Sequence, residues 1–456
     1  MLTAARRTPV FVAVTSAAAL GLVVAGCGRS SSPSSTPSTP ASSSSASAST
    51  SAAGDFGTLK ALCGPGTPSG ATARGLTATT IRIGVLADVG ATVAPGLGQE
   101  FFDSAHAFSK WCNAAGGIGG RKIVIDKLDS QVFNVGQSIV NACQKDFMLV
   151  GGGTPLDNAG VKQRLGCKLG QIPAYEVSTQ AIEAGLQVKP YPVIATQQPF
   201  GGFRLMAEKY PDSKTKGVAI GSGNSASLAT GGKRTAYATE HNGYKTLLQL
   251  RPLQVDNFRP YMEELKGAGV AGIGESSGVT IAPEIQGMKN IGWMPEWMLF
   301  TYQFYNQQAV DSAKSLGTFP PSYVALNYLP FELSDQSPAL KEIKTQLTAT
   351  VSKPQYTQFT SEAYSSWTLF AKAATACGAN LTQDCVLQKA GSETAWTGGG
   401  IQPPVSTSPS ASSMSDCVAI VRLTTGGWVY DKAVTQPNKD FYNCDPKNVA
   451  VTPANP

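Results

Sequence analysis

The sequence predicts an α/β fold of two doubly wound parallel-sheet lobes, joined by three crossings around a cleft. Three observations support this prediction. A strand–helix–strand unit occupies residues 81–129, the same alternation returns from Lys216 onward, and proline-rich stretches interrupt the series. Strands that alternate with helices along a chain form parallel sheets with right-handed crossovers.

The first unit sets the pattern for the rest. Residues 81–86 form a β-branched run, and residues 98–115 carry apolar side chains at helical spacing. Glycines within 113–120 end that helix, and a second strand follows at 121–128. Further first-lobe elements are expected as helices at 134–146 and 158–165 and strands at 147–150 and 171–175.

A second series of strands and helices follows, and a hairpin closes it. We expect strands at 218–220, 246–253, 270–274, 297–302 and 323–328, helices at 228–242, 258–266, 281–291, 338–351 and 362–377, and a hairpin of 417–423 with 428–430.

Three interruptions predict the crossings between lobes. These are the prolines at 190, 192 and 199, the Pro320–Pro321 pair, and the Ser/Pro-rich stretch 402–415. They give lobe 1 as 79–195 and 318–400, lobe 2 as 196–317 and 415–435, and a C-terminal tail as 436–456. Ligands of open parallel sheets sit at the carboxyl ends of the strands, so two facing edges predict a cleft that closes by a hinge.

The N-terminus has the pattern of a secretory signal. Arg6 and Arg7 precede an apolar stretch, and small residues lead to Cys27, which resembles a bacterial lipobox. The resemblance implies a signal peptide at 1–26 and lipidation of Cys27; the alternative is a transmembrane anchor. Residues 30–53 are only Ser, Thr, Pro and Ala, so we expect 27–78 to be a disordered tether.

The eight other cysteines favour disulfides outside the cytoplasm. Eight cysteines allow roughly a hundred connectivities, so the sequence alone leaves the pairing open. The pairing that we expect is Cys143–Cys167, Cys377–Cys385, Cys417–Cys444 and, by elimination, Cys63–Cys112.

Composition argues against several classes of function. Charged residues make up 14% of the chain, and no basic tract marks a nucleic-acid surface. The only histidines, His106 and His241, precede the GxSxG match at 274–278, whereas a hydrolase elbow requires a later histidine. We therefore expect no enzyme activity, no metal site and no cofactor.

Five segments carry a resemblance to a known family. Residues 81–86, 98–100, 113–123, 142–147 and 364–374 resemble the extracellular ligand-binding family of branched-chain amino acid type. These are type I periplasmic binding proteins, which deliver solutes to ABC importers. The resemblance covers about 79–430. It implies a monomeric solute-binding lipoprotein, anchored by lipid to the outer face of the cytoplasmic membrane, with an ABC permease as partner. The alternative is a sensor or adaptor of the same fold, which signals to a membrane partner without transport.

In this family the ligand touches the strand-end loops of both lobes. Backbone N–H groups and hydroxyls at such loops suit an anionic carboxylate. The implied ligand-binding residues are Thr154, Val177, Ser178 and Thr179 in lobe 1, and Ser225, Ser227, Ser276, Tyr302, Gln303 and Phe304 in lobe 2. An alternative is that Thr154, Ser178 and Thr179 are ordinary turn and cap residues.

The sequence departs from the amino-acid binders at Gln303. Those proteins place a carboxylate there for the substrate ammonium, and an amide cannot supply that charge. Tyr302, Phe304 and Tyr305 instead offer aromatic faces for a flat ligand or a cation, unless they belong to the core. An aromatic acid, an amide or another small polar solute is therefore as good a candidate as an amino acid.

Overall fold

The structure is a computed structural model that describes residues 53–68, 70, 73–252, 254–276 and 281–456. The chain divides into Met1–Thr50 and Ser51–Pro456, and the description below concerns the second unit. The expected signal peptide and Cys27 lie outside the described residues.

Lobe 1 is built on a parallel sheet with strand order β2-β1-β3-β4. Ile83 of β1 pairs with Ile125 of β2 on one side and Met148 of β3 on the other. The first βαβ unit is therefore parallel, as the sequence predicted. The elements are β1 (Thr80–Ala87), α1 (Gln99–Ala114), β2 (Lys122–Asp129), α2 (Val135–Lys145), β3 (Met148–Val150), α3 (Asn158–Gly166), β4 (Gln171–Ile172) and α4 (Thr179–Ile182).

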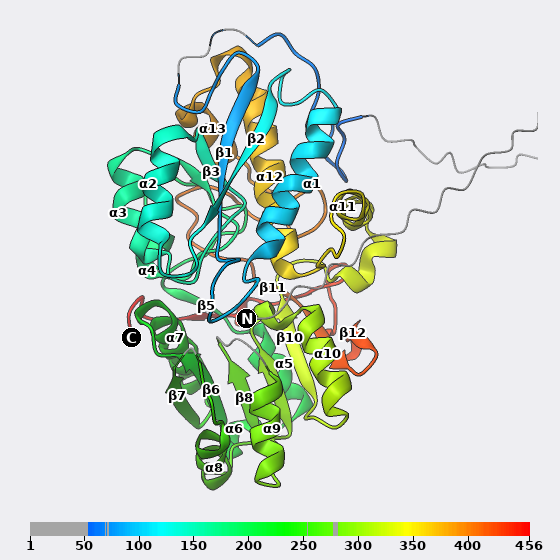
Figure 1. Cartoon of the computed structure of the whole chain (residues 1–456). Coiled ribbons are helices and arrows are strands. Elements are labelled where there is room, and N and C mark those ends of the chain that lie inside the picture. Colours follow the sequence, from blue (N-terminus) through cyan, green and yellow to red (C-terminus); the bar gives the residue numbers. More distant parts are fainter. Residues whose placement is uncertain (1–52, 69, 71–72, 253, 277–280) are drawn as a thin grey trace, which may run out of the picture. The chain divides into compact units, whose positions relative to one another are not determined.

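A later segment of the chain returns to cover lobe 1, where α12 lies beside α1 (Figure 1). Thr357 and Thr360 form a capping box that fixes the start of α12. Phe108 of α1 stacks on Trp367 of α12 with ring centroids 5.6 Å apart. The returning elements are η2 (Phe331–Gln336), α11 (Pro338–Thr348), α12 (Gln358–Cys377), η3 (Gly378–Asn380) and α13 (Gln383–Ala390).

Lobe 2 contains a second sheet with order β12-β11-β10-β9-β8-β6-β7. Strands β6 to β10 are parallel, and β11 and β12 form the expected antiparallel hairpin. Two parallel-sheet lobes confirm the predicted fold class. The strands are β6 (Val218–Gly223), β7 (Thr246–Arg251), β8 (Gly272–Glu275), β9 (Trp297–Phe300), β10 (Ser322–Leu326), β11 (Cys417–Thr424) and β12 (Gly427–Tyr430). The helices are α5 (Gly201–Lys209), α6 (Ser213–Lys216), α7 (Ala226–His241), α8 (Arg259–Ala268), α9 (Ala282–Asn290), η1 (Tyr302–Phe304) and α10 (Gln307–Leu316).

The second crossing lies later than we expected. We assigned 318–400 to lobe 1 because of Pro320–Pro321, but β10 belongs to the sheet of lobe 2. Tyr323 of β10 pairs with Leu299 of β9 and with Arg422 of β11. The two prolines therefore lead into a strand of the same sheet, and the chain crosses only after Leu326.

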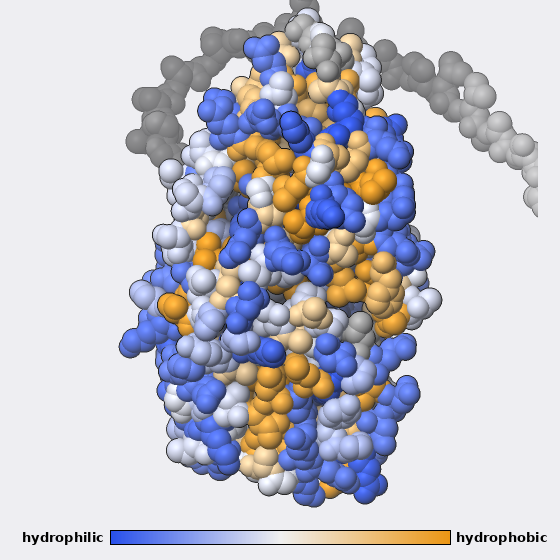
Figure 2. Space-filling model, turned by 90° about the vertical axis from the view of Figure 1, so that its left-hand side faces the viewer, coloured by the Kyte–Doolittle hydropathy of each residue, from blue (hydrophilic) through white to orange (hydrophobic). Residues whose placement is uncertain are grey.

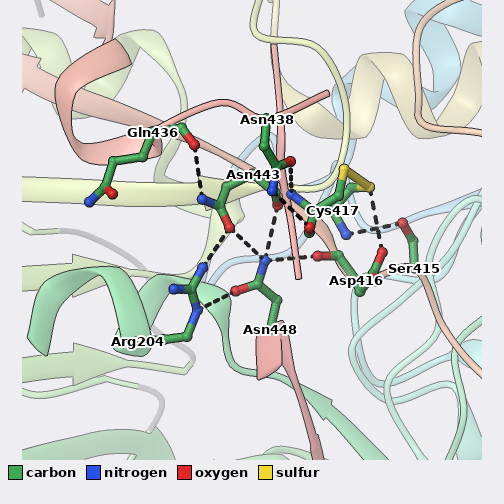
Figure 3. Close-up of a disulfide and its surroundings, with 9 residues drawn as sticks. Arg204, Ser415, Asp416, Cys417, Gln436, Asn438, Asn443 and Asn448 are labelled. Atoms are coloured by element: carbon green, nitrogen blue, oxygen red, sulfur yellow. Dashed lines mark hydrogen bonds between the residues drawn. A yellow bond between two sulfur atoms is a disulfide. The ribbon is translucent and has the colours of Figure 1, made fainter. Parts of the chain in front are cut away.

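Residues 436–451 are part of lobe 2, which corrects the expected tail. Strand β13 (Asn443–Cys444) pairs with β11, and β14 (Val449–Val451) pairs with β5 (Gln197–Pro199). Figure 3 shows the polar network that fixes this segment beside the Cys417–Cys444 disulfide. Arg204 of α5 donates to Asn448 at 2.8 Å and to Asn443 at 2.5 Å. The remaining elements are α14 (Lys432–Thr435) and η4 (Pro446–Asn448).

The ordered body begins well before residue 79, which shortens the expected tether. Phe56 is completely buried and stacks on Tyr364 of α12, with ring centroids 5.8 Å apart. Cys63 is bonded to Cys112 of α1. The low-complexity stretch ends at Ala53, and the aromatic and apolar residues after it can be buried. Within the described part, the disulfides pair as expected: Cys63–Cys112, Cys143–Cys167, Cys377–Cys385 and Cys417–Cys444.

The surface carries small apolar patches among hydrophilic side chains on the face drawn in Figure 2. The most exposed large apolar side chains in the described part are Val451 and Phe133, 78% and 65% exposed. Among the helices of the described residues, none combines the length and apolar character needed to cross a bilayer.

Candidate ligand-binding cleft

A cleft of about 910 Å³ is lined by residues of both lobes. This volume is near the upper end of the roughly 300–1,000 Å³ typical of small-molecule sites. Lobe 1 contributes residues 92–100 from the loop before α1 and its first turn, with Val132, Leu156, Tyr175 and Phe359, and lobe 2 contributes Leu228, Arg251, Phe258, Glu275, Glu284, Gln303 and Phe304. Many of these residues follow the carboxyl ends of strands, where ligands of open α/β sheets bind.

Two hydrogen bonds join the lobes beside this cleft. The side-chain amide of Gln303, in η1 after β9, donates to the Tyr175 hydroxyl at 2.6 Å. The Ser227 hydroxyl at the start of α7 donates to the carbonyl of Pro155 at 2.8 Å. The Tyr175 ring also packs on Phe359, with centroids 5.1 Å apart. The loop after β4 therefore contacts lobe 2 directly.

A buried group of three charges forms one wall of the cleft. Arg251 at the end of β7 contacts Glu275 at the end of β8, and its Nη1 lies 3.3 Å from Glu284 Oε1 on α9. All three side chains are almost completely buried. Burial raises the pKa of the Glu275 carboxyl well above its ordinary value, although the Arg251 charge opposes this. One guanidinium thus faces two carboxyl groups in a buried part of the cleft wall.

Gly221 of β6 makes room for these charges. A Cβ at this position would lie 1.7 Å from Nη2 of Arg251 and 2.2 Å from Oε1 of Glu275. The group can pack across the sheet only because residue 221 has no side chain.

The family described as periplasmic binding protein matches residues 80–427, which is most of the chain. The chain is a type I periplasmic binding protein. Members of this family are solute-binding proteins, and the family is extracytoplasmic. No functionally curated protein matches the sequence.

Solved structures share the fold of this binding protein at low sequence identity. The fatty acid ABC transporter substrate-binding protein from Thermomonospora curvata is 16% identical, with a TM-score of 0.63 over 83% of this chain and 96% of that one. A branched-chain amino acid ABC transporter from Thermus thermophilus with bound valine is 12% identical, with a TM-score of 0.63 over 81% and 98%. The leucine-binding protein from Thermotoga maritima is 10% identical, with a TM-score of 0.60 over 77% and 98%.

Three of the expected lobe 1 residues of the binding protein, Val177, Ser178 and Thr179, have hydrogen-bond partners within the protein. The backbone amides of Val177 and Ser178 donate to the carboxylate of Asp157, at 2.7 and 3.1 Å. The Ser178 hydroxyl accepts from Ala181 N and caps α4. The Thr179 hydroxyl donates to the carbonyl of Ala454 at 3.1 Å. These residues do not line the cleft.

The other expected residues lie in different places. Gln303 and Phe304 line the cleft. Thr154 lines a separate cavity of about 40 Å³, and Ser276 and Tyr302 line one of about 160 Å³. Within the described residues, the buried hydroxyls of Ser225 and Ser276 have no hydrogen-bond partner.

Sequence reasoning did not identify the charged wall. Arg251 ends the edge strand β7 and Glu275 ends the buried strand β8, and a charge at a strand end was the available signal. Glu284 lies in the first turn of α9, where a carboxylate also suits the helix dipole, so its position alone indicated nothing more. The pairing among them depends on β7, β6 and β8 being neighbours in the sheet.

A second buried carboxyl group belongs to Glu362 of α12. Glu362 of α12 accepts from Gln358 Nε2 at 2.9 Å. Burial raises the pKa of Glu362 to about 8, so this side chain is largely protonated at neutral pH.

Proposed function

We propose that this protein captures a small molecule in the cleft between its lobes and delivers it to an ABC importer. The observation that carries the proposal is the 910 Å³ cleft, because its walls come from both sheets. A ligand that touches both walls binds the closed arrangement more tightly than the open one. Closure then gives a permease a signal that distinguishes loaded from empty protein.

The site chemistry fits binding rather than catalysis. The polar groups on the cleft wall include the ions of Arg251, Glu275 and Glu284 and several side-chain amides, and the histidines lie elsewhere on α1 and α7. The expected roles of Gln303 and Phe304 in ligand contact are supported by their place on the cleft wall. We propose that the protein acts as a monomer without a cofactor.

We also propose that Cys27 carries the lipid that holds the protein at the membrane. The small residues before Cys27 and the Ser/Thr/Pro/Ala stretch after it support this proposal. A Cys27→Ser variant should move from the membrane fraction to the medium or soluble fraction and should fail to incorporate labelled fatty acid. If Cys27→Ser stays in the membrane fraction, the anchor lies elsewhere.

Ligand binding is tested on the purified soluble body. Native mass spectrometry of the protein as isolated should detect a bound small molecule, and a broad solute panel should contain compounds that raise Tm. Absence of both effects would contradict the proposal. Deletion of the gene should abolish uptake of the identified solute; intact uptake with a changed cellular response would favour a sensor.

A further inference from the structure

The position expected to bind a ligand carboxylate is already filled by a carboxylate of the protein. Asp157 precedes α3, but its side chain makes no capping hydrogen bond to that helix. It turns instead to the strand-end loop and accepts from Val177 N at 2.7 Å and Ser178 N at 3.1 Å. A ligand carboxylate at these amides would have to displace Asp157 or lie against a like charge.

The Gln303 amide is also engaged within the protein. The resemblance implies that Gln303 stands where amino-acid binders place a carboxylate for the substrate ammonium, and its amide donates to the Tyr175 hydroxyl at 2.6 Å.

The open volume of the cleft lies beside Arg251, Glu275 and Glu284. Apolar side chains on the cleft lining include Leu97, Val132, Leu156, Phe258 and Phe359. The acidic lining residues are Glu100, Asp256, Glu275, Glu284 and Asp311, against the basic residues Arg251 and Lys353. Acidic side chains are in excess both deep in the cleft and at its rim.

The excess matters most at the buried wall. Arg251 is shared between Glu275 and Glu284, so the three groups carry one more carboxylate than guanidinium. A buried carboxylate without a full counter-charge is costly, and it is relieved by a proton or by a cation. A cationic group entering the cleft would supply that charge.

We propose that the cleft binds an apolar molecule carrying a cationic amine or guanidine group, with the carboxyl groups of Glu275 and Glu284 as its partners. This inference rests on the proposed function, because it names the ligand class of the same cleft.

Matched probes of equal chain length test the charge preference by calorimetry on the soluble body. Octylammonium should bind at least about tenfold more tightly than octanoate or leucine, with the neutral octanol between them, since like charges in a desolvated site are strongly unfavourable. Tighter binding of octanoate or leucine would overturn the inference and leave the proposed function standing. If neither these probes nor the broad solute panel binds, both fall.

Variants assign the charge preference to particular residues. Glu275→Gln and Glu284→Gln should each weaken octylammonium binding about tenfold or more while octanol binding stays unchanged. Glu263→Gln on the exposed face of α8 is the matched control and should change neither. Equal loss of octylammonium and octanol binding would indicate a general packing defect and overturn the role of the two carboxylates.

Discussion

The amide of Gln303 and the hydroxyl of Tyr175 form a hydrogen bond of 2.6 Å that joins lobe 2 to lobe 1 beside the cleft. It is one of two side-chain hydrogen bonds described above that connect the walls, the other running from Ser227 to Pro155. Because the bond exists only when the lobes meet, it favours the closed arrangement.

Tyr175→Phe should therefore shift the unliganded protein toward an open arrangement. The ring contact with Phe359 can remain, while the Gln303 amide loses its acceptor. A hydrogen bond of this kind contributes about 1 kcal/mol, which corresponds to about a fivefold change in the open-to-closed ratio. Distances between fluorescent labels on the two lobes should lengthen. Tyr237→Phe on α7 is the control, and an unchanged distance distribution for Tyr175→Phe would contradict the role of the bond.

Glu362→Gln should change the pH dependence of stability. The folded pKa of about 8 lies above the ordinary 4.5, so the wild type is fully stabilised below pH 4.5 and loses stability as pH rises from 4.5 to 8. Each pH unit in this window changes the free energy of unfolding by up to about 1.4 kcal/mol.

Glutamine mimics the protonated carboxyl and does not ionise. The variant should match the wild type near pH 4.5 and unfold at higher denaturant concentration than the wild type at pH 9. Glu263→Gln should leave the pH profile unchanged. Parallel denaturation curves for Glu362→Gln and wild type across pH 4.5–9 would show that Glu362 does not titrate in this range.

Gly221→Ala should destabilise the protein, because the added methyl group would overlap the Arg251 guanidinium. Overpacking of this kind typically costs about 1–3 kcal/mol, and thermal melting measures it. Gly231→Ala provides the contrast. A Cβ at residue 231 on α7 meets nothing within 4 Å, so alanine should be neutral or stabilising by up to about 1 kcal/mol. Equal Tm values for the two variants would mean that the charged wall can shift.

Phe56→Ala should lower stability by about 3–5 kcal/mol, since Phe56 is completely buried against Tyr364. The matched variant Phe133→Ala removes a side chain that is 65% exposed and should change stability by less than about 0.5 kcal/mol. Urea denaturation compares them. A small effect of Phe56→Ala would place the start of the stable body after residue 56.

The patterns that the sequence predicted well are local. The βαβ unit at 81–129, the strands expected at 218–220 and 297–302, and the closing hairpin follow from period, β-branching and glycine position. The disulfide pairing was also anticipated, since three of the bridges join cysteines close in sequence. Helices α5, α10 and α13 were missed, because their apolar residues are few and their burial depends on neighbouring elements.

The boundaries and the site depended on contacts between distant segments. Pro320–Pro321 indicated a crossing, yet β10 pairs within lobe 2, and the expected C-terminal tail supplies strands β13 and β14. Thr179 was expected to meet a ligand, but the C-terminal Ala454 reaches its hydroxyl. Local sequence patterns do not predict such contacts between segments that lie far apart in the sequence.

By itself, the sequence determined the two α/β lobes, the family and the presence of a cleft at the strand ends, because hydrophobic period and glycine position act locally. Only the tertiary structure decided what that cleft offers to a ligand. Asp157 meets Val177, and Arg251 meets Glu275 and Glu284, through folding of segments 20 or more residues apart. The net charge of this buried group depends on which acidic and basic side chains are packed together, and only the folded chain determines that.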